Sequence, residues 1–225
     1  MKLLTFSDVD QWRKASLEKV LAKIEKILIN QDSCRIALSG GSTPQWLYTQ
    51  LSDADLDFKR IEIFQVDERY TNSNSPNLNA NMIKTTLAKD SRRFKAVHFF
   101  NIDLSWHESA QAYDQLLNTL SQPLFDLVIL GVGPDGHTAS LFPHSKALAS
   151  NSLATISTTD SFAESQRLTL TSKAITQAAS IIVLASGKEK QPIIDRFVAD
   201  QGSIKDLPIL SVRRHPDIIV FYNQN

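Results

Sequence analysis

Apolar residues along the chain fall into two patterns that alternate with each other. Apolar side chains recur at helical spacing, and so predict helices or helical turns, over residues 8–30, 45–51, 82–89, 106–120, 172–178 and 192–198. Short apolar runs or strict alternation predict strands over residues 35–38, 61–66, 96–100, 125–130, 153–157, 166–170, 180–185 and 218–222. Because strands and helices take turns, we expect an α/β fold: a mainly parallel sheet with helices on both faces.

Length and composition suit one domain of this class. The 225 residues are 42% hydrophobic and 21% charged, as in ordinary globular proteins, and no repeat or linker divides them. We therefore expect a single domain over residues 1–225. Lys plus Arg and Asp plus Glu both number 24, which argues against a dedicated nucleic-acid or membrane-surface protein. Any anionic ligand must be bound by a local cluster of positive groups.

The N-terminus and the single cysteine indicate a compartment. The first residues lack the long apolar core of a signal peptide, and no run approaches the roughly 20 apolar residues that span a bilayer. Cys34 lies in an apolar run and has no partner for an intrachain disulfide, so we interpret it as a buried structural thiol. These features predict a cytoplasmic location.

A glycine-rich turn at residues 131–137 follows the strand predicted at 125–130, and it presents an Asp and a His. Three glycines surround Asp135, and His137 comes next. Glycine adopts backbone conformations closed to other residues and lets a ligand approach the main chain. The turn falls at the carboxyl end of a strand, where open α/β sheets bind ligands. We interpret it as the centre of a ligand site.

A second glycine turn, Gly40-Gly41-Ser42-Thr43, lies between the strand at 35–38 and the next helix. Free backbone N–H groups and the positive end of the helix dipole converge there, and hydroxyl groups lie beside them, which favours an anion. The turn is neither a Walker loop nor GxGxxG, so a phosphate monoester or sugar hydroxyls suit it better than a nucleotide. A plain helix cap is the alternative interpretation.

Further charged residues lie at or near the ends of other strands. Asp67 and Arg69 follow the strand at 61–66, and a surface ion-pair cluster is the alternative for them. Arg167 and either Lys190 or Lys188 supply the donors that bind phosphate oxygens.

His137 can act as a general base near neutral pH, with Asp135 or Asp67 orienting it. Arg69 can stabilise negative charge that develops on a carbonyl oxygen. No Gly-x-Ser-x-Gly elbow exists, and Ser140 lies past the His turn, so attack by activated water is favoured over an acyl-enzyme.

A metal site is a weak alternative at this turn. His137 and His144 are seven residues apart, His215 is remote, and no His-Glu-x-x-His spacing occurs. We therefore expect no metal site.

Five segments together resemble the 6-phosphogluconolactonase family. They are residues 38–44 (LSGGSTP), 66–69 (VDER), 130–143 (LGVGPDGHTASLFP), 167–170 (RLTL) and 187–190 (GKEK). The resemblance implies a modified Rossmann-like fold, as in glucosamine-6-phosphate deaminases. It also implies hydrolysis of 6-phospho-D-glucono-1,5-lactone to 6-phosphogluconate in the oxidative pentose phosphate pathway, without metal or cofactor. The expected partner is this phosphorylated lactone, bound by a monomer or small homo-oligomer.

The resemblance also implies residue roles. By analogy His137 activates water with Asp135 nearby, and Arg69 lies at the reacting end of the substrate. Ser42, Arg167 and Lys190 then bind the phosphate.

Two alternatives remain beside the lactonase. The related glucosamine-6-phosphate deaminase/isomerase family has a Glu five residues after the His, where this chain has Phe142, and a Tyr where it has Arg69. Both departures favour the lactonase. A non-catalytic sugar-phosphate sensor is the other alternative, although His137 is retained. Lactonases commonly carry Ser-Asn where this chain has Leu78-Asn79, which leaves the role of Asn79 open, and the predicted loop at 71–81 could act as a lid.

Overall fold

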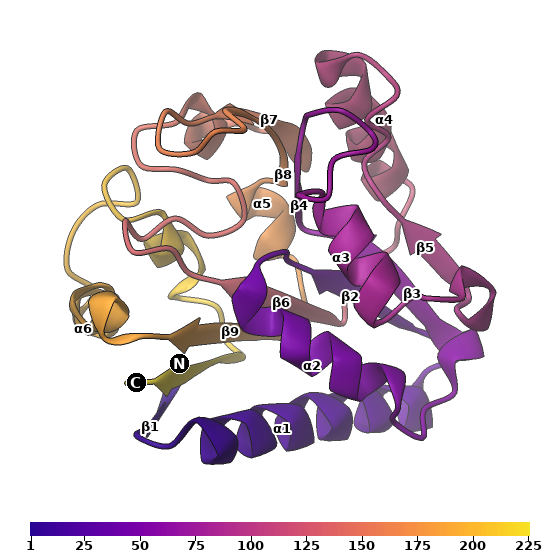
Figure 1. The fold of residues 1–225 in the computed structure, drawn as a ribbon, viewed down its shortest axis with the longest axis horizontal. Helices are drawn as coiled ribbons and strands as arrows, with labels where there is room; N and C mark the ends of the chain where they lie inside the picture. Colours follow the sequence, from indigo (N-terminus) through magenta and orange to yellow (C-terminus); the bar gives the residue numbers. More distant parts are fainter.

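The large sheet of the protein is entirely parallel. The computed structural model describes residues 1–225. Seven strands pair in the order β1-β10-β9-β6-β2-β3-β5 (Figure 1). Their bounds, in that order, are Lys2–Phe6, Ile218–Asn223, Ile181–Ser186, Leu127–Gly131, Cys34–Leu38, Ile61–Gln65 and Ala96–His98. The predicted parallel α/β sheet is confirmed.

Helices cover both faces of this sheet because successive strand residues point to opposite sides. In β6, Leu127 and Ile129 join one hydrophobic core, whereas Val128 and Leu130 join the other. The first core is closed by α1 (Val9–Asn30), α2 (Ser42–Ser52) and α3 (Asn79–Thr86), and the second by α4 (Trp106–Asn118), α5 (Ser172–Ile175) and α6 (Gln191–Ala199). Short 3₁₀ turns lie at Phe58–Arg60, Ser91–Arg93, Lys146–Ala149, Lys188–Lys190 and Pro208–Val212. None of the helices combines the length and apolarity needed to cross a membrane.

A small antiparallel sheet stands beside the large one. It consists of β4 (Asp67–Arg69), β8 (Gln166–Leu170) and β7 (Ala154–Thr158), in that order. The sequence indicated only a polar cluster at 67–69, because three consecutive charged residues carry no strand pattern. The segment is a strand because its backbone pairs with β8, whose apolar residues anchor it in the second core.

Two other boundaries differ from the prediction. Strand β1 was not predicted, since its five residues become a strand only through pairing with β10. Helix α3 begins at Asn79, inside the predicted loop at 71–81. The buried Glu68 carboxylate accepts the backbone N–H groups of Asn79 and Ala80 at 2.7 and 2.8 Å, and so satisfies the first turn of the helix.

The sheet order reverses between β2 and β6. From β2 the chain proceeds through β3 to β5 on one side, and from β6 through β9 to β10 on the other. Ligands of open α/β sheets bind at such a switch point, outside the carboxyl ends of the strands. The two glycine turns of the sequence follow these two neighbouring strands, so the topology brings them together.

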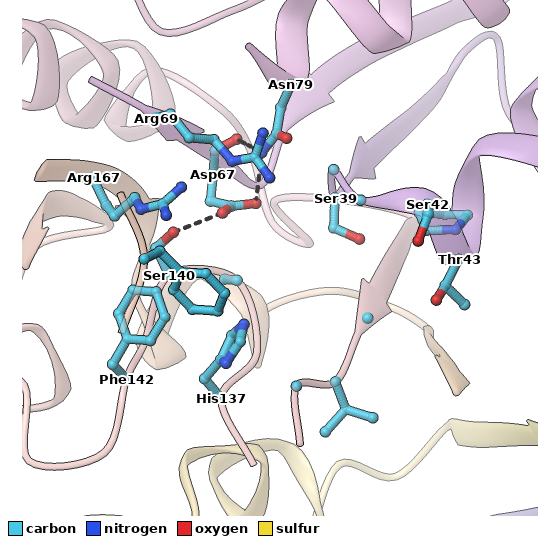
Figure 2. A pocket seen from close by; sticks show the side chains of 18 of the residues that line it. Ser39, Ser42, Thr43, Asp67, Arg69, Asn79, His137, Ser140, Phe142 and Arg167 are labelled. Carbon is cyan, nitrogen blue, oxygen red and sulfur yellow. Dashed lines mark hydrogen bonds between the residues drawn. The ribbon is translucent and has the colours of Figure 1, made fainter. Parts of the chain in front are cut away.

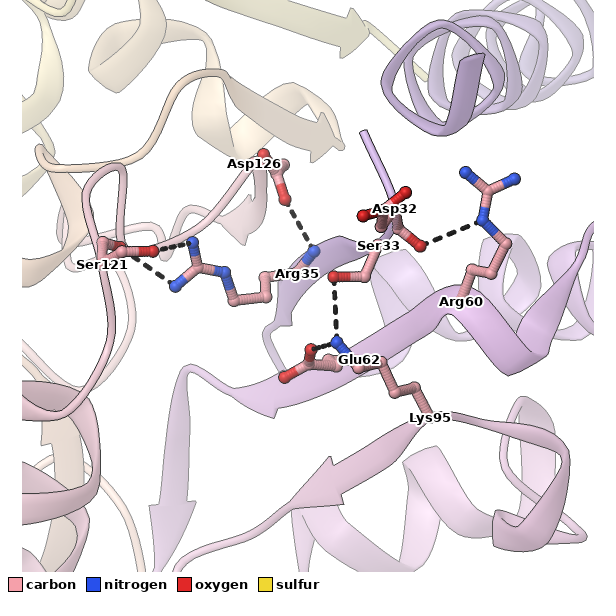
Figure 3. A network of polar contacts seen from close by, with 8 residues as sticks. All are labelled: Asp32, Ser33, Arg35, Arg60, Glu62, Lys95, Ser121 and Asp126. Carbon is pink, nitrogen blue, oxygen red and sulfur yellow. Dashed lines mark hydrogen bonds and ion pairs between the residues drawn. The ribbon is translucent and has the colours of Figure 1, made fainter. Parts of the chain in front are cut away.

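The amino ends of the strands are closed by polar contacts instead (Figure 3). The buried Asp126 carboxylate accepts the backbone N–H of Arg35 at 2.8 Å, and the guanidinium of Arg35 donates to the carbonyl of Ser121 at 3.0 Å. Lys95 pairs with Glu62 at 2.7 Å. These contacts join the amino ends of β2, β3, β5 and β6. The carboxyl ends of the strands remain free for a site.

Candidate active site

A cavity of about 280 Å³ lies at the switch point (Figure 2). It is lined by every predicted site residue except Asp135: Gly40, Gly41, Ser42, Thr43, Asp67, Arg69, His137, Arg167 and Lys190. Asp135 lies behind His137 and lines an adjoining cavity. Segments that are far apart in the sequence therefore meet in one place.

The turn that carries His137 needs its glycines. A Cβ atom on Gly133 would lie 2.2 Å from the His137 ring, and Gly136 has a φ of +81°. The turn is closed by a hydrogen bond from the Gly133 N–H to the His137 carbonyl at 2.8 Å. The glycines thus let the backbone fold closely around the imidazole.

Asp135 is the hydrogen-bond partner of His137. One carboxylate oxygen lies 2.5 Å from His137 Nδ1 and also accepts the His137 backbone N–H at 3.1 Å. Burial alone would raise the pKa of Asp135, but these hydrogen bonds and the proximity of His137 outweigh it and lower the pKa. The carboxylate therefore stays ionised and favours the tautomer with a proton on Nδ1. In that tautomer Nε2, which has no hydrogen-bond partner in the protein, is the free base.

Asp67 has different partners, so it does not orient His137. Its buried carboxylate accepts a hydrogen bond from the Ser140 hydroxyl at 2.7 Å, and its backbone carbonyl accepts one from the Asn79 amide at 2.9 Å (Figure 2). Asn79 is itself buried and packs against Gly40, where a Cβ atom would lie 1.8 Å from its Oδ1. Asn79 therefore fixes Asp67 relative to the first glycine turn, which answers the question that the sequence left open.

Two arginines occupy paired positions on neighbouring strands of the small sheet. Arg69 on β4 is directly opposite Arg167 on β8, an arrangement of like charges that is unfavourable unless an anion compensates it. The Arg69 guanidinium donates to the carbonyl of Asn77. Arg167 is only 4% exposed, and its side chain makes no hydrogen bond. Burial, followed by Arg69, lowers the pKa of Arg167. A buried arginine without partners indicates an anionic ligand.

The first glycine turn opens the N-terminus of α2 to the same cavity. Gly41 precedes the helix with a φ of +97°, which favours glycine, and no side chain caps the first turn. The positive end of the helix therefore remains available to an anion. Lys190 lines the same cavity, whereas Lys188 does not. Burial lowers the pKa of Lys190. Of the two candidate lysines, the structure places Lys190 at the site.

The first turn of α2 and the two arginines lie on different sides of the cavity. Figure 2 shows Ser42 and Thr43 on one side, and Arg69, Arg167 and Asp67 on the other. Arg167 and His137 both contact Phe162, since the guanidinium carbon and the His137 ring lie 5.5 and 5.8 Å from the centre of the Phe162 ring. Ser42 and Arg167 both line the cavity, and their shared role in binding the phosphate stays a prediction.

Sequence reasoning did not find some residues of the site. Ser140 was considered only as a nucleophile, yet it binds Asp67. Glu68 was treated as part of a charged cluster, and no motif marked Phe162, which lines the cavity from a loop. Burial raises the pKa of Glu68, although the amide of Gln65 and three backbone N–H groups donate to its carboxylate. Such contacts exist only in the folded chain, so the sequence carried little signal for them.

The comparison with protein families covers nearly the whole chain. Residues 7–220 match the model described as glucosamine-6-phosphate isomerases/6-phosphogluconolactonase. The chain belongs to this family. A 6-phosphogluconolactonase from Synechocystis sp. is 33% identical over 214 residues, which cover 91% of this chain and 88% of that protein. One from Nostoc sp. is 35% identical over 193 residues, with coverages of 82% and 79%.

Solved structures of this family share the fold. The 6-phosphogluconolactonase of Thermotoga maritima superposes with a TM-score of 0.85 at 29% identity, covering 99% of this chain and 98% of that one. A monomeric glucosamine-6-phosphate deaminase superposes with a TM-score of 0.84 at 20% identity, covering 100% and 98%. The expected deaminase-like fold is thus confirmed. Because both branches of the family share it, the choice of reaction depends on the site.

Proposed function

We propose that this protein hydrolyses 6-phospho-D-glucono-1,5-lactone to 6-phosphogluconate. The observation that carries the proposal is a base and an unpaired cation in one cavity: His137, with Nε2 free, and the buried, unpartnered Arg167 line the same cavity and both contact Phe162. Hydrolysis of a lactone needs these two groups, one to activate water and one to stabilise the oxyanion. The curated relatives named 6-phosphogluconolactonase support the same reaction.

In the proposed mechanism, His137 Nε2 takes a proton from water as the water oxygen bonds to the lactone carbonyl carbon. The carbonyl oxygen becomes an oxyanion, which Arg167 and Arg69 stabilise by donating hydrogen bonds. Asp135 stabilises the imidazolium that forms. The oxyanion then reforms the carbonyl, the bond to the ring oxygen breaks, and His137 returns its proton to that oxygen. The product is an open-chain acid.

The phosphate would bind on the other side of the cavity. The uncapped N-terminus of α2 at Ser42 and Thr43 offers backbone donors, and Lys190 supplies a positive charge. The cavity lining contains three basic side chains, Arg69, Arg167 and Lys190, against the single carboxylate of Asp67. In a chain without net charge, this concentration of cations favours a substrate with an anionic group.

Phe142 disfavours the deaminase/isomerase reaction. Its ring lies 4.7 Å from the His137 ring and lines the cavity at the position where that branch of the family has a Glu. An aromatic ring cannot transfer the protons that ring opening and isomerisation require. The retained base, with its Asp135 partner and with two arginines in the same cavity, likewise disfavours a non-catalytic sensor.

We also propose that residues 1–225 act as one catalytic domain. The small sheet, which carries both arginines, packs in the same hydrophobic core as one face of the large sheet, which supports this unit. We propose a cytoplasmic location, where thiols such as Cys34 stay reduced, and a monomer or small homo-oligomer that needs no cofactor. Size-exclusion chromatography with light scattering tests the oligomeric state.

The decisive experiment compares two substrates on one preparation. We expect turnover of 6-phosphogluconolactone, after subtraction of its spontaneous hydrolysis, and none of glucosamine 6-phosphate, with chelator making no difference. His137→Ala should lower kcat by about two orders of magnitude, the usual effect of losing a general base. His107→Ala, at an exposed histidine on α4, is the matched control and should retain full activity. Near-wild-type turnover by His137→Ala would refute the mechanism.

A further inference from the structure

Phe162 is a large apolar residue at the active-site cavity that the proposed mechanism does not use. Its side chain lines the cavity but is 45% exposed, whereas Phe142 beside it is only 5% exposed. The Phe162 ring meets the His137 ring edge-on at 5.8 Å and lies 5.9 Å from the Phe142 ring. The Arg167 guanidinium carbon lies 5.5 Å from the centre of the same ring. One half-exposed ring therefore contacts both groups of the reacting end.

The loop that carries Phe162 is held across the cavity. Residues 159–165 connect β7 to β8, and the Thr159 N–H donates to the Ser165 carbonyl at 3.0 Å, which closes the base of the loop. Next to this base, Glu164 accepts a hydrogen bond from the Asn77 amide at 2.7 Å. The carbonyl of Asn77 in turn accepts from Arg69. Two loops far apart in the sequence are thus linked to each other and to a cavity arginine.

We propose, resting on the lactonase function above, that Phe162 is a substrate-covering residue whose ring closes over the reacting end of the lactone and excludes bulk water from His137 and Arg167. The rings of Phe142 and Phe162 offer an apolar surface that suits the C–H face of a six-membered sugar lactone. Exclusion of water lowers the local dielectric, which strengthens the attraction between Arg167 and the oxyanion. The exposed part of the ring becomes buried when the substrate arrives.

The kinetic test uses variants at this position. Phe162→Ala should lower kcat/KM about tenfold, because it removes the aromatic and cation–π contacts, and Phe162→Tyr should retain most of the activity. The melting temperature should change little, since the side chain is half exposed on a loop. Ile29→Ala, at an 82% exposed residue of α1, is the matched control and should behave as wild type. A kcat/KM within twofold of wild type, or a loss explained by a lower melting temperature, would overturn the proposal.

A binding test does not depend on turnover. In Phe162→Trp, the product 6-phosphogluconate should shift the emission of the introduced indole to shorter wavelength and protect it from acrylamide, relative to the wild type with its three native tryptophans. If calorimetry shows that the product binds while the indole stays as quenchable as before, the proposal is wrong. If the proposed lactonase function is wrong, the result differs: the wild type would neither hydrolyse the lactone nor bind the product. The proposed role of Phe162 would then be wrong as well.

Discussion

Replacing Asp135 by Asn tests whether this carboxylate acts through His137. The substitution keeps the shape of the side chain but removes the charge that lies 2.5 Å from His137 Nδ1. The charge matters most when His137 carries the extra proton taken from water, that is, in the transition state. Asp135→Asn should therefore lower kcat and leave KM nearly unchanged, since Asp135 does not line the substrate cavity.

The magnitude follows from the type of hydrogen bond. A hydrogen bond to a charged group contributes about 1.5–3 kcal/mol and a neutral one about 0.5–1.5 kcal/mol, so the difference is about 1–1.5 kcal/mol. Because 1.36 kcal/mol corresponds to a factor of ten, kcat should fall about tenfold. The effect would be larger if the amide of the new Asn donates to Nδ1, because Nε2 would then carry the proton and could not act as a base.

The assay follows formation of 6-phosphogluconate with a coupled dehydrogenase, at saturating lactone and with the spontaneous rate subtracted. Asp55→Asn, at an exposed aspartate without side-chain hydrogen bonds, controls for loss of a carboxylate. Unchanged kcat in Asp135→Asn, together with an inactive His137→Ala variant, would refute the positioning role. A large rise in KM would place Asp135 in substrate binding instead.

Three further predictions concern the two sides of the cavity and its pH response. Arg167→Ala should lower kcat about 100-fold with little change in KM, measured in the same assay, if Arg167 stabilises the oxyanion. Gly40→Ala should raise KM and lower the melting temperature, measured by calorimetry, because the new Cβ meets Asn79. Because the pKa of Asp135 is lowered in the fold, its ionised carboxylate stabilises the protein at pH values above about 4, the ordinary pKa of an aspartate. This contribution is lost as the pH falls through the lower pKa of the folded state. The difference in unfolding free energy between wild type and Asp135→Asn should therefore shrink from pH 6 to pH 3.

Each of these predictions has an opposite outcome. A high KM with normal kcat in Arg167→Ala would move that residue to the phosphate side, where the sequence motifs placed it. Wild-type kinetics in Gly40→Ala would mean that Asn79 shifts without consequence for the turn. A stability difference in Asp135→Asn that grows as the solution is acidified would have the wrong sign for a carboxylate with a lowered pKa.

The sequence predicted the parallel sheet well because its strands are buried on both faces. Runs such as that at 125–130 are apolar throughout, and their alternation with helices determines the architecture. The small sheet was missed because β4 consists of Asp67, Glu68 and Arg69, which no hydrophobic pattern marks. Its identity as a strand depends on pairing with a segment about 100 residues away, a contact that only tertiary structure creates.

The site shows the same division. Glycine turns are visible in a sequence because glycine is required wherever the backbone approaches a ligand or adopts positive φ, and both turns line the cavity. Hydrogen-bond partners are not visible in a sequence: Asp135 and Asp67 were both candidates to orient His137, and only the geometry separates them. Phe162 lies on an irregular loop, and its position over His137 follows from the linked loops rather than from any local pattern.

The two hydrophobic cores bear on which sugar phosphates this protein accepts. The glycine turn leads into α2, whose Leu47 and Leu51 belong to one core, whereas β8, which carries Arg167, packs Leu168 and Leu170 into the other. The proposed phosphate site at the glycine turn and the proposed carbonyl site at Arg167 are therefore anchored in two different cores. If both sites bind as proposed, the framework of the protein sets the distance between them, and a lactone phosphate one carbon shorter would fit this distance less well.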